Sequence, residues 1–273
     1  MAAIYDCTVP SELLTGMRLA RAAISKGELV VIPTDTVYGL AADAFNPEAV
    51  QRLLDAKGRT RQSPPPVLIP DLRTLDALAE TVSEPVRALT AKFWPGGLTV
   101  VVPARSSLLW DLGETAGTVA LRMPSDPIAL ELLAETGPLA VSSANLTGLP
   151  AALSAEEAER MLGDSVTVYL SLGHPESGAV PGPGPADAVG LPSTILDATV
   201  PEEIRVIRLG VISEAELRAV VGDALKSDRL GPAAGVPAAE APTVAEPIDA
   251  GPIEIDLADT VLAETDPTDE PAG

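Results

Sequence analysis

Short apolar runs alternate with capped helical segments along most of this chain, and this alternation restricts the possible folds more than any other feature. Residues 29–32 predict a buried strand that ends at Pro33, because proline cannot donate a hydrogen bond to a neighbouring strand. Asn46 followed by Pro47 is typical of a helix start, and Gly58 lies just past the expected end of that helix. Strands that alternate with helices favour an α/β fold, and we expect one domain with a twisted mixed sheet.

The other segments follow the same alternation. Further helices are expected over residues 11–26, with Ser11 as N-cap, and from Asp71, Ser83 and Asp126, and two more open with the capping boxes Ser154 with Glu157 and Ser213 with Glu216. Strands are expected over residues 28–33, 67–69, 98–102, 118–122, 139–142, 166–170, 193–196 and 204–209.

The composition changes near residue 223, where Ala, Pro, Glu, Asp and Thr begin to dominate without apolar periodicity. We therefore expect a folded domain over residues 1–222 and an acidic, Ala- and Pro-rich disordered tail over residues 223–273. The whole chain has a formal net charge of −21, which disfavours non-specific binding to nucleic acid or to an anionic membrane.

Cysteine and histidine each occur once, as Cys7 and His174. One cysteine excludes an internal disulfide and a cysteine-rich metal site, and one histidine leaves no pair for a zinc cluster. His174 lies in a loop rich in glycine and proline, where a solvated histidine is more common than a catalytic one. The chain shows no signal peptide and no apolar run long enough to span a bilayer, so we expect a cytoplasmic protein that does not contact membranes.

Small polar groups and cations gather at the expected ends of strands and helices. They are residues 34–36, Lys57, Arg59, Arg122, residues 142–145, residues 193–194 and Arg208. Such ends bind ligands in open α/β sheets, and converging cations suit an anionic small molecule. Helix dipoles, self-satisfied turns and surface ion pairs are the ordinary alternatives for these residues. The glycine fingerprints of P-loop and dinucleotide-binding enzymes do not occur.

Six motifs in series resemble one known family. They are PTDTVYGL at 33–40, KGR at 57–59, TVALRMP at 118–124, SSAN at 142–145, PSTILD at 192–197 and IRLG at 207–210. Together they are similar to the YrdC/Sua5/TsaC family of threonylcarbamoyl-AMP synthases, over about residues 10–220 and in the form that has this domain alone. The resemblance implies a YrdC-like domain whose twisted mixed sheet carries flanking helices and a concave ligand cleft.

Members of this family make L-threonylcarbamoyladenylate and pyrophosphate from L-threonine, bicarbonate and ATP, and the resemblance implies the same nucleotidyltransferase activity here. ATP would then be a substrate, and Mg²⁺ would accompany it. The product would pass to a t⁶A transferase complex, which makes tRNA, modified at position 37, an indirect partner. Threonine carbamate supplies its own oxygen nucleophile, so catalysis would consist of positioning and charge stabilisation at phosphorus.

The resemblance also implies roles for single residues. Lys57 and Arg59 would be catalytic and face the phosphates, and Thr36, Arg122 and Ser193 would bind threonine. ATP or adenylate contacts would come from Arg59, Ser63, Thr118, Ser143, Asn145 and Arg208, and no residue is assigned to a metal. The chain departs from the family near Leu68, where many members carry a histidine that contacts threonine.

Two other functions compete with this interpretation. One is an RNA-binding module that holds tRNA on the basic surface of the same fold, although the net charge of −21 and the few aromatic residues count against it. The other is carbamoyl transfer, because YrdC-like domains also occur in hydrogenase-maturation proteins. Those proteins carry additional zinc-finger segments, for which a chain with one cysteine has no counterpart.

Overall fold

The computed structural model describes residues 3–173 and 190–226, and the ten strands of this part form one mixed sheet. In spatial order the strands are β1 (Ala3–Asp6), β8 (Val168–Ser171), β2 (Val30–Ile32), β3 (Gly39–Asp43), β7 (Leu139–Ser143), β4 (Val67–Leu68), β6 (Thr118–Arg122), β5 (Leu98–Pro103), β9 (Thr194–Asp197) and β10 (Arg205–Arg208). Parallel pairs such as β5 with β9 occur beside antiparallel pairs such as β5 with β6. The predicted α/β fold with a mixed sheet is confirmed.

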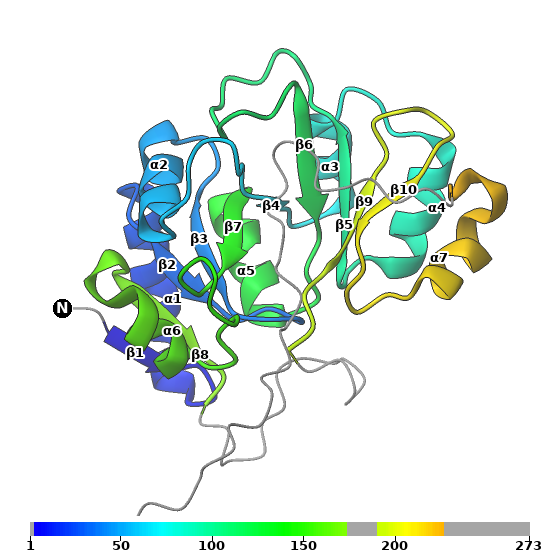
Figure 1. Ribbon diagram of the computed structural model, residues 1–273. Helices are drawn as coiled ribbons and strands as arrows, with labels where there is room; N and C mark the ends of the chain where they lie inside the picture. The colour runs from blue at the N-terminus through cyan, green and yellow to red at the C-terminus, as the bar shows by residue number, and fades with distance from the viewer. Residues whose placement is uncertain (1–2, 174–189, 227–273) are drawn as a thin grey trace, which may run out of the picture. The chain divides into compact units, whose positions relative to one another are not determined.

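Four helices cover the two faces of the β1-β8-β2-β3-β7 half of the sheet (Figure 1). On one face α1 (Pro10–Ser25) and α5 (Pro127–Thr136) bury Ile24 and Leu132 against Ile32. On the other face α2 (Pro47–Ala56) and α6 (Ala155–Leu162) pack, with Leu53 of α2 buried against Val31. Successive strand residues point to opposite faces, so the continuous apolar run of β2 reflects a strand covered on both sides.

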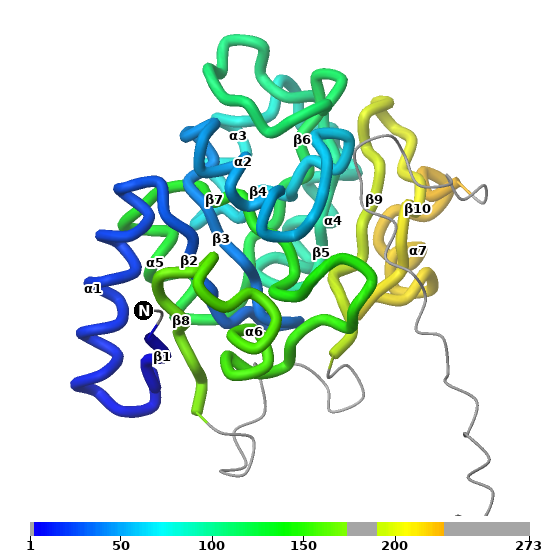
Figure 2. Tube along the Cα trace, turned by 60° about the vertical axis from the view of Figure 1, so that its left-hand side comes forward, coloured from blue at the N-terminus to red at the C-terminus, as the bar shows by residue number. Residues whose placement is uncertain are grey.

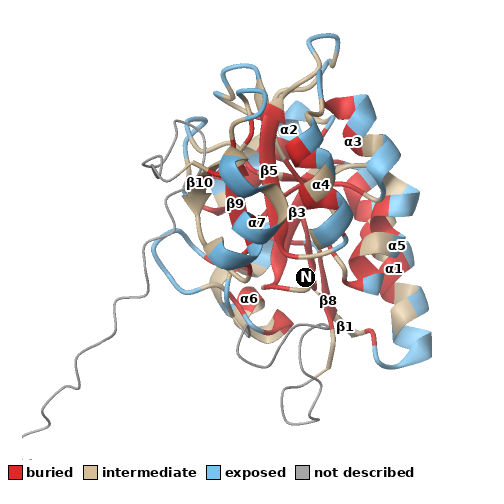
Figure 3. Cartoon of the chain, turned by 90° about the vertical axis from the view of Figure 1, so that its right-hand side faces the viewer, coloured by how far each residue is buried: buried red, intermediate tan, exposed pale blue. Residues whose placement is uncertain are grey.

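Three further helices cover one face of the remaining strands. They are α3 (Leu72–Leu78), α4 (Glu84–Phe93) and α7 (Glu214–Val221), and Leu89 of α4 packs in one cluster with Val100 and Leu121. Thr99 and Arg122 alternate with those apolar residues and point to the opposite face. Polar side chains on that face agree with the ligand cleft expected there. Figure 2 places α1 and α7 at opposite ends of the sheet, and Figure 3 shows the strands buried beneath helices whose outer faces are exposed.

Local capping signals predict most helix starts correctly. The Asn46 side chain accepts hydrogen bonds from the backbone of Glu48 and Ala49, both at 3.1 Å, and Asp126 caps α5 in the same way. These signals succeed because both partners lie within three residues of the cap.

Two helix starts differ in detail from the prediction. Helix α1 begins at Pro10 with Val9 as N-cap, so Ser11 lies inside the first turn and is not the cap. Proline is well suited to that first position, because its missing N–H would have no partner there. The Ser154 box is incomplete, because the Glu157 carboxylate accepts a hydrogen bond from Leu153 N. The Ser213 box is complete, as predicted.

Two strands lacked a sequence prediction, and both depend on distant partners. β1 pairs with β8 from Ala3↔Val168 onward, and β3, with the sequence GLAAD, pairs with β7. Glycine and alanine have low strand propensity, so nothing local marks β3 as a strand.

The fold continues past the predicted domain boundary at residue 222. A short 3₁₀ helix (Gly222–Ala224) leads to Leu225, which is 2% exposed, and Lys226 N donates to Ile204 O at 2.8 Å. The domain therefore includes residues 223–226. The rest of the predicted tail, at 227–273, and His174 lie outside the described residues. Among the described helices, none combines the length and the apolar character that a membrane crossing requires.

Candidate functional site

The turn between β2 and β3 is held by its own hydroxyl groups. Thr34 Oγ1 donates to Val37 O at 2.6 Å and accepts from Thr36 N at 3.2 Å. It also lies 3.1 Å from Thr36 Oγ1. These bonds satisfy a buried turn that follows directly from the strand. The turn therefore presents the Thr36 hydroxyl in one fixed place.

Arg122, at the end of β6, reaches this turn and is almost completely buried. Its Nη1 donates to Thr36 Oγ1 at 2.9 Å and its Nε donates to Gly96 O at 3.0 Å. Its Nη2 lies 2.8 Å from Asp35 Oδ1 as an ion pair, but without hydrogen-bond alignment, and has no other acceptor in the described part of the chain. A guanidinium has five N–H groups and these contacts engage three of them, so Arg122 keeps further N–H groups for a ligand.

Lys57, which follows α2, is 1% exposed and points into the turn after β7. Its ammonium donates to the backbone oxygens of Ser143 and Asn145 and, at 3.0 Å, to Asn145 Oδ1. An ammonium has three donors, so all of them are used within the protein. Burial and the positive charge of Arg59 lower the pKa of Lys57 to about 7.

Arg59 lies two residues further along and is partly exposed. Its Nη1 donates to Ser142 Oγ at 3.1 Å and its Nε donates to Thr147 Oγ1 at 3.2 Å. Thr147 Oγ1 in turn donates to Lys57 O at 2.7 Å. Two hydroxyl groups thus hold the guanidinium, while Nη2 has no hydrogen-bond partner among the described residues and is available for an anion.

The third part of the site joins β5, β9 and β10. Thr99 Oγ1 donates to Ser193 Oγ at 2.9 Å, and Arg208 Nη2 donates to Ser193 O at 2.8 Å. Burial and the positive charges of Arg122 and Arg59 lower the pKa of Arg208 to about 10. Arg208 is therefore close enough to Arg122 and Arg59 to be repelled by both, which is costly unless an anion binds beside them.

The structure brings together most of the predicted site residues, but two of them have their side-chain groups engaged elsewhere. Asn145 Nδ2 donates to Leu146 O at 3.0 Å and to Leu149 O at 2.6 Å, so its amide is used within its own turn. Thr118 Oγ1 donates to Thr115 O at 2.8 Å. Ser63 is partly exposed, and its side chain has no hydrogen bond within the described ranges.

Leu68 lies at the position where many members of the family were expected to carry a histidine. It pairs in register with Arg122, and its side chain is 3% exposed in the cluster that also contains Ile128. An apolar side chain therefore lies beside Arg122 on the same face of the sheet.

Sequence reasoning missed Thr99 and Thr147 as site residues. Thr99 carries a weak signal, since it is a hydroxyl inside an otherwise apolar strand. Thr147 carries none, because its partner Arg59 is 88 residues away in the chain.

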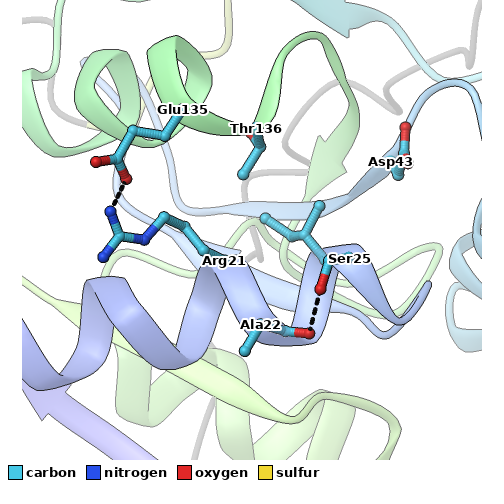
Figure 4. Close-up of a pocket in the computed structure, with 7 residues that line it drawn as sticks. Arg21, Ala22, Ser25, Asp43, Glu135 and Thr136 are labelled. Atoms are coloured by element: carbon cyan, nitrogen blue, oxygen red, sulfur yellow. Dashed lines mark hydrogen bonds and ion pairs between the residues drawn. The ribbon is translucent and has the colours of Figure 1, made fainter.

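A surface pocket of about 450 Å³ lies apart from this site (Figure 4). It is lined by residues of α1 and α5 with Asp43, and an ion pair joins Arg21 to Glu135 across it. Asp43 is the last residue of β3, whereas the Thr36 turn precedes the first. None of the predicted site residues lines this pocket, and its one ion pair gives it no chemistry beyond a surface contact.

The carboxylates near the site do not suit a resident Mg²⁺ ion. No cluster of three metal-ligating side chains occurs in residues 3–173 and 190–226. Asp35, which pairs with Arg122, is buried against that guanidinium. Mg²⁺ is commonly held by substrate phosphates and one or two carboxylates, so an ion that arrives with a nucleotide needs no such cluster.

Comparison with known proteins identifies relatives across most of the chain. The Sua5/YciO/YrdC family model, described as telomere recombination, matches residues 22–210. A Mycobacterium tuberculosis H37Rv protein, provisionally named threonylcarbamoyl-AMP synthase, is 45% identical over 222 residues, which are 81% of this chain and 96% of that protein. The Bacillus subtilis threonylcarbamoyl-AMP synthase is 38% identical over 74% of this chain and 56% of its own length.

Solved structures agree with these relatives. The crystal structure of Pyrococcus abyssi Sua5 complexed with L-threonine matches with a TM-score of 0.72 at 27% identity, over 87% of this chain and 67% of that one. The Escherichia coli YciO structure matches with a TM-score of 0.63 at 24% identity, over 80% of this chain and 98% of that one, and shows likeness of fold.

Proposed function

Since the chain belongs to the Sua5/YciO/YrdC family, we propose that it is an L-threonylcarbamoyladenylate synthase, which makes threonylcarbamoyl-AMP and pyrophosphate from L-threonine, bicarbonate and ATP. One observation supports this most strongly. The positive charges of Arg59 and Arg122 both act on Arg208, in a protein whose net charge is −21. Such a local excess of positive charge suits substrates that are themselves anionic, namely a carboxylate, a carbamate and a triphosphate.

In the proposed reaction the amino group of threonine combines with bicarbonate to give a carbamate and water. A carbamate oxygen then attacks the α-phosphorus of ATP, and the bond to pyrophosphate breaks. No protein nucleophile is needed, so the protein holds the reactants and stabilises the charge at phosphorus. We assign Arg122, Thr36 and Ser193 to the amino acid, and Arg59 and Arg208 to the phosphates.

Lys57 has a different part in this proposal. Because its three donors are used by Ser143 and Asn145, it acts by fixing the turn after β7. That turn would present Ser143 and the backbone near Asn145 to the adenylate. Thr118 and Ser63 complete the proposed nucleotide contacts.

Mg²⁺ enters this proposal together with ATP, whose phosphates would hold it. The adenylate would be handed to a t⁶A transferase complex for modification of tRNA position 37, in the cytoplasm. Residues 1–226 would carry the activity, and the acidic residues that follow would not contribute to it.

Pyrophosphate release by the purified protein tests the proposal. We expect turnover of ATP only when L-threonine and bicarbonate are both present, with an adenylate product whose mass equals that of threonylcarbamoyl-AMP. Omission of either co-substrate is the control. Binding of ATP without turnover in the complete mixture would refute the synthase function, and retention of tRNA by such a protein would support the RNA-binding alternative.

A further inference from the structure

We propose that Thr99 is a positioning residue that orients the Ser193 hydroxyl as a hydrogen-bond donor to an oxygen of the amino-acid substrate. The inference rests on the proposed function for the identity of that substrate. Thr99 contacts Ser193, which is assigned to the substrate, and would not contact the substrate itself.

Thr99 lies in β5, between β6 and β9, with its side chain directed away from α4 and α7. Its neighbours Leu98 and Val100 both belong to the cluster under α4 and α7, and side chains alternate along a strand, so Thr99 points to the opposite face. It is 1% exposed, and its hydroxyl has one hydrogen bond among the described residues, the donation to Ser193 Oγ at 2.9 Å. A buried hydroxyl is costly without a partner, so the Ser193 contact accounts for a polar residue at this position.

The strand pairing explains why the two side chains meet. β5 and β9 run parallel, with Leu98 opposite Thr194 and Thr99 opposite Ile195. Ser193 directly precedes Thr194, at the mouth of the parallel pair. Threonine is β-branched and has few accessible rotamers in a strand, so the donor is held in one direction.

Ser193 is left with one hydrogen-bonding capacity that the described residues do not use. Its Oγ accepts from Thr99 Oγ1 and, at 3.4 Å, from Arg208 Nη2, and a hydroxyl has two lone pairs and one proton. The proton has no acceptor in the described part of the chain, and Ser193 is 8% exposed. With Thr99 Oγ1 and the more distant Arg208 Nη2 on its acceptor side, the hydroxyl has its proton left to donate, and a ligand oxygen would be the acceptor.

The backbone at Ser193 is fixed independently of Thr99. Arg208 donates to Ser193 O through Nη2 at 2.8 Å and through Nε at 3.3 Å. Loss of the Thr99 hydroxyl should therefore release the Ser193 side chain while its backbone stays in place. This separates a positioning role from a general structural one.

Thr99→Val tests the proposal, because valine has nearly the same shape and lacks the hydroxyl. We expect the KM and the dissociation constant for L-threonine to rise about tenfold, the scale of one lost hydrogen bond, while the KM for ATP stays within twofold. Thr99→Ser keeps the donor and should restore wild-type values. Thr90→Val is the matched control, since Thr90 is a buried threonine that donates only within α4.

A double-mutant cycle with Ser193→Ala decides whether Thr99 acts through Ser193. In the Ser193→Ala background, Thr99→Val should change the affinity for L-threonine by less than twofold. If the effects of Thr99→Val and Ser193→Ala on the affinity for L-threonine were fully additive, the inference would be overturned. An equal rise in the KM of both substrates for Thr99→Val would also overturn it. L-threonine binding is measured by calorimetry, which does not depend on turnover. A wild-type protein that binds L-threonine without turnover would refute the synthase function, while the cycle would still decide the role of Thr99. A wild-type protein that binds no L-threonine would overturn both.

Discussion

Replacement of Lys57 by methionine should reduce the stability of the protein as well as its activity, in contrast to replacement of Arg59. Lys57 is 1% exposed and donates to three oxygens of residues 143–145. A buried acceptor without its donor costs about 1–3 kcal/mol. Methionine also removes the cost of burying a charge, which offsets part of the loss. We expect a net decrease of about 2 kcal/mol in the free energy of unfolding.

Arg59→Met should leave the stability nearly unchanged. Arg59 is partly exposed, and its two hydrogen bonds go to neutral hydroxyl groups, of which that of Thr147 belongs to an exposed residue. The free energy of unfolding should fall by less than about 1 kcal/mol. Turnover should nevertheless fall about a hundredfold, because a charge partner of the phosphates is lost. Lys26→Met, at an exposed lysine, is the control for the loss of a positive charge.

The pH dependence of stability gives a second test of Lys57. Its pKa of about 7 in the folded protein lies below the usual 10.5, so between these values the unfolded chain binds more protons. Stability should therefore rise with pH across this range, by at most ~1.4 kcal/mol per pH unit, and Lys57→Met should remove that part of the slope. Urea unfolding between pH 6 and pH 10 measures both quantities. If Lys57→Met were as stable as wild type at every pH but inactive, Lys57 would act on the substrate directly, and the reasoning would be refuted.

Three further predictions concern other parts of the fold. Arg122→Lys should raise the KM for L-threonine at least tenfold and leave the KM for ATP within twofold. The reason is that lysine cannot bond Thr36 Oγ1 and Gly96 O together as the guanidinium does. Equal changes in both KM values would place Arg122 outside the amino-acid site. Burial raises the pKa of the Cys7 thiol to about 12, so iodoacetamide at pH 8 should label it only after unfolding. Rapid labelling of the native protein would contradict the burial of β1 against β8. Removal of residues 227–273 should leave turnover within twofold. Removal of residues 223–273 should lower the midpoint of thermal unfolding, because Leu225 is buried. Equal midpoints for the two truncated proteins would show that Leu225 adds nothing to the core.

Short windows of sequence predicted most of the helix starts and the cationic character proposed for the site. Caps such as Asn46 and Asp126 bond to backbone groups two or three residues away, so a short window of sequence contains the whole interaction. The cations at the ends of strands were visible in the same way, and their number relative to an acidic chain indicated an anionic ligand.

The partners of these side chains, and of Thr99, follow only from how distant segments of the chain pack together. Lys57 meets oxygens 86 and 88 residues away, Arg122 meets a hydroxyl 86 residues away, and Thr99 meets Ser193 at a separation of 94 residues. The sheet order brings these positions together, and strand order depends on pairings such as β3 with β7 that short-range propensity does not encode. The physical reason is that hydrogen-bond partners are fixed by distances of about 3 Å, whereas sequence patterns report only which face of an element is buried.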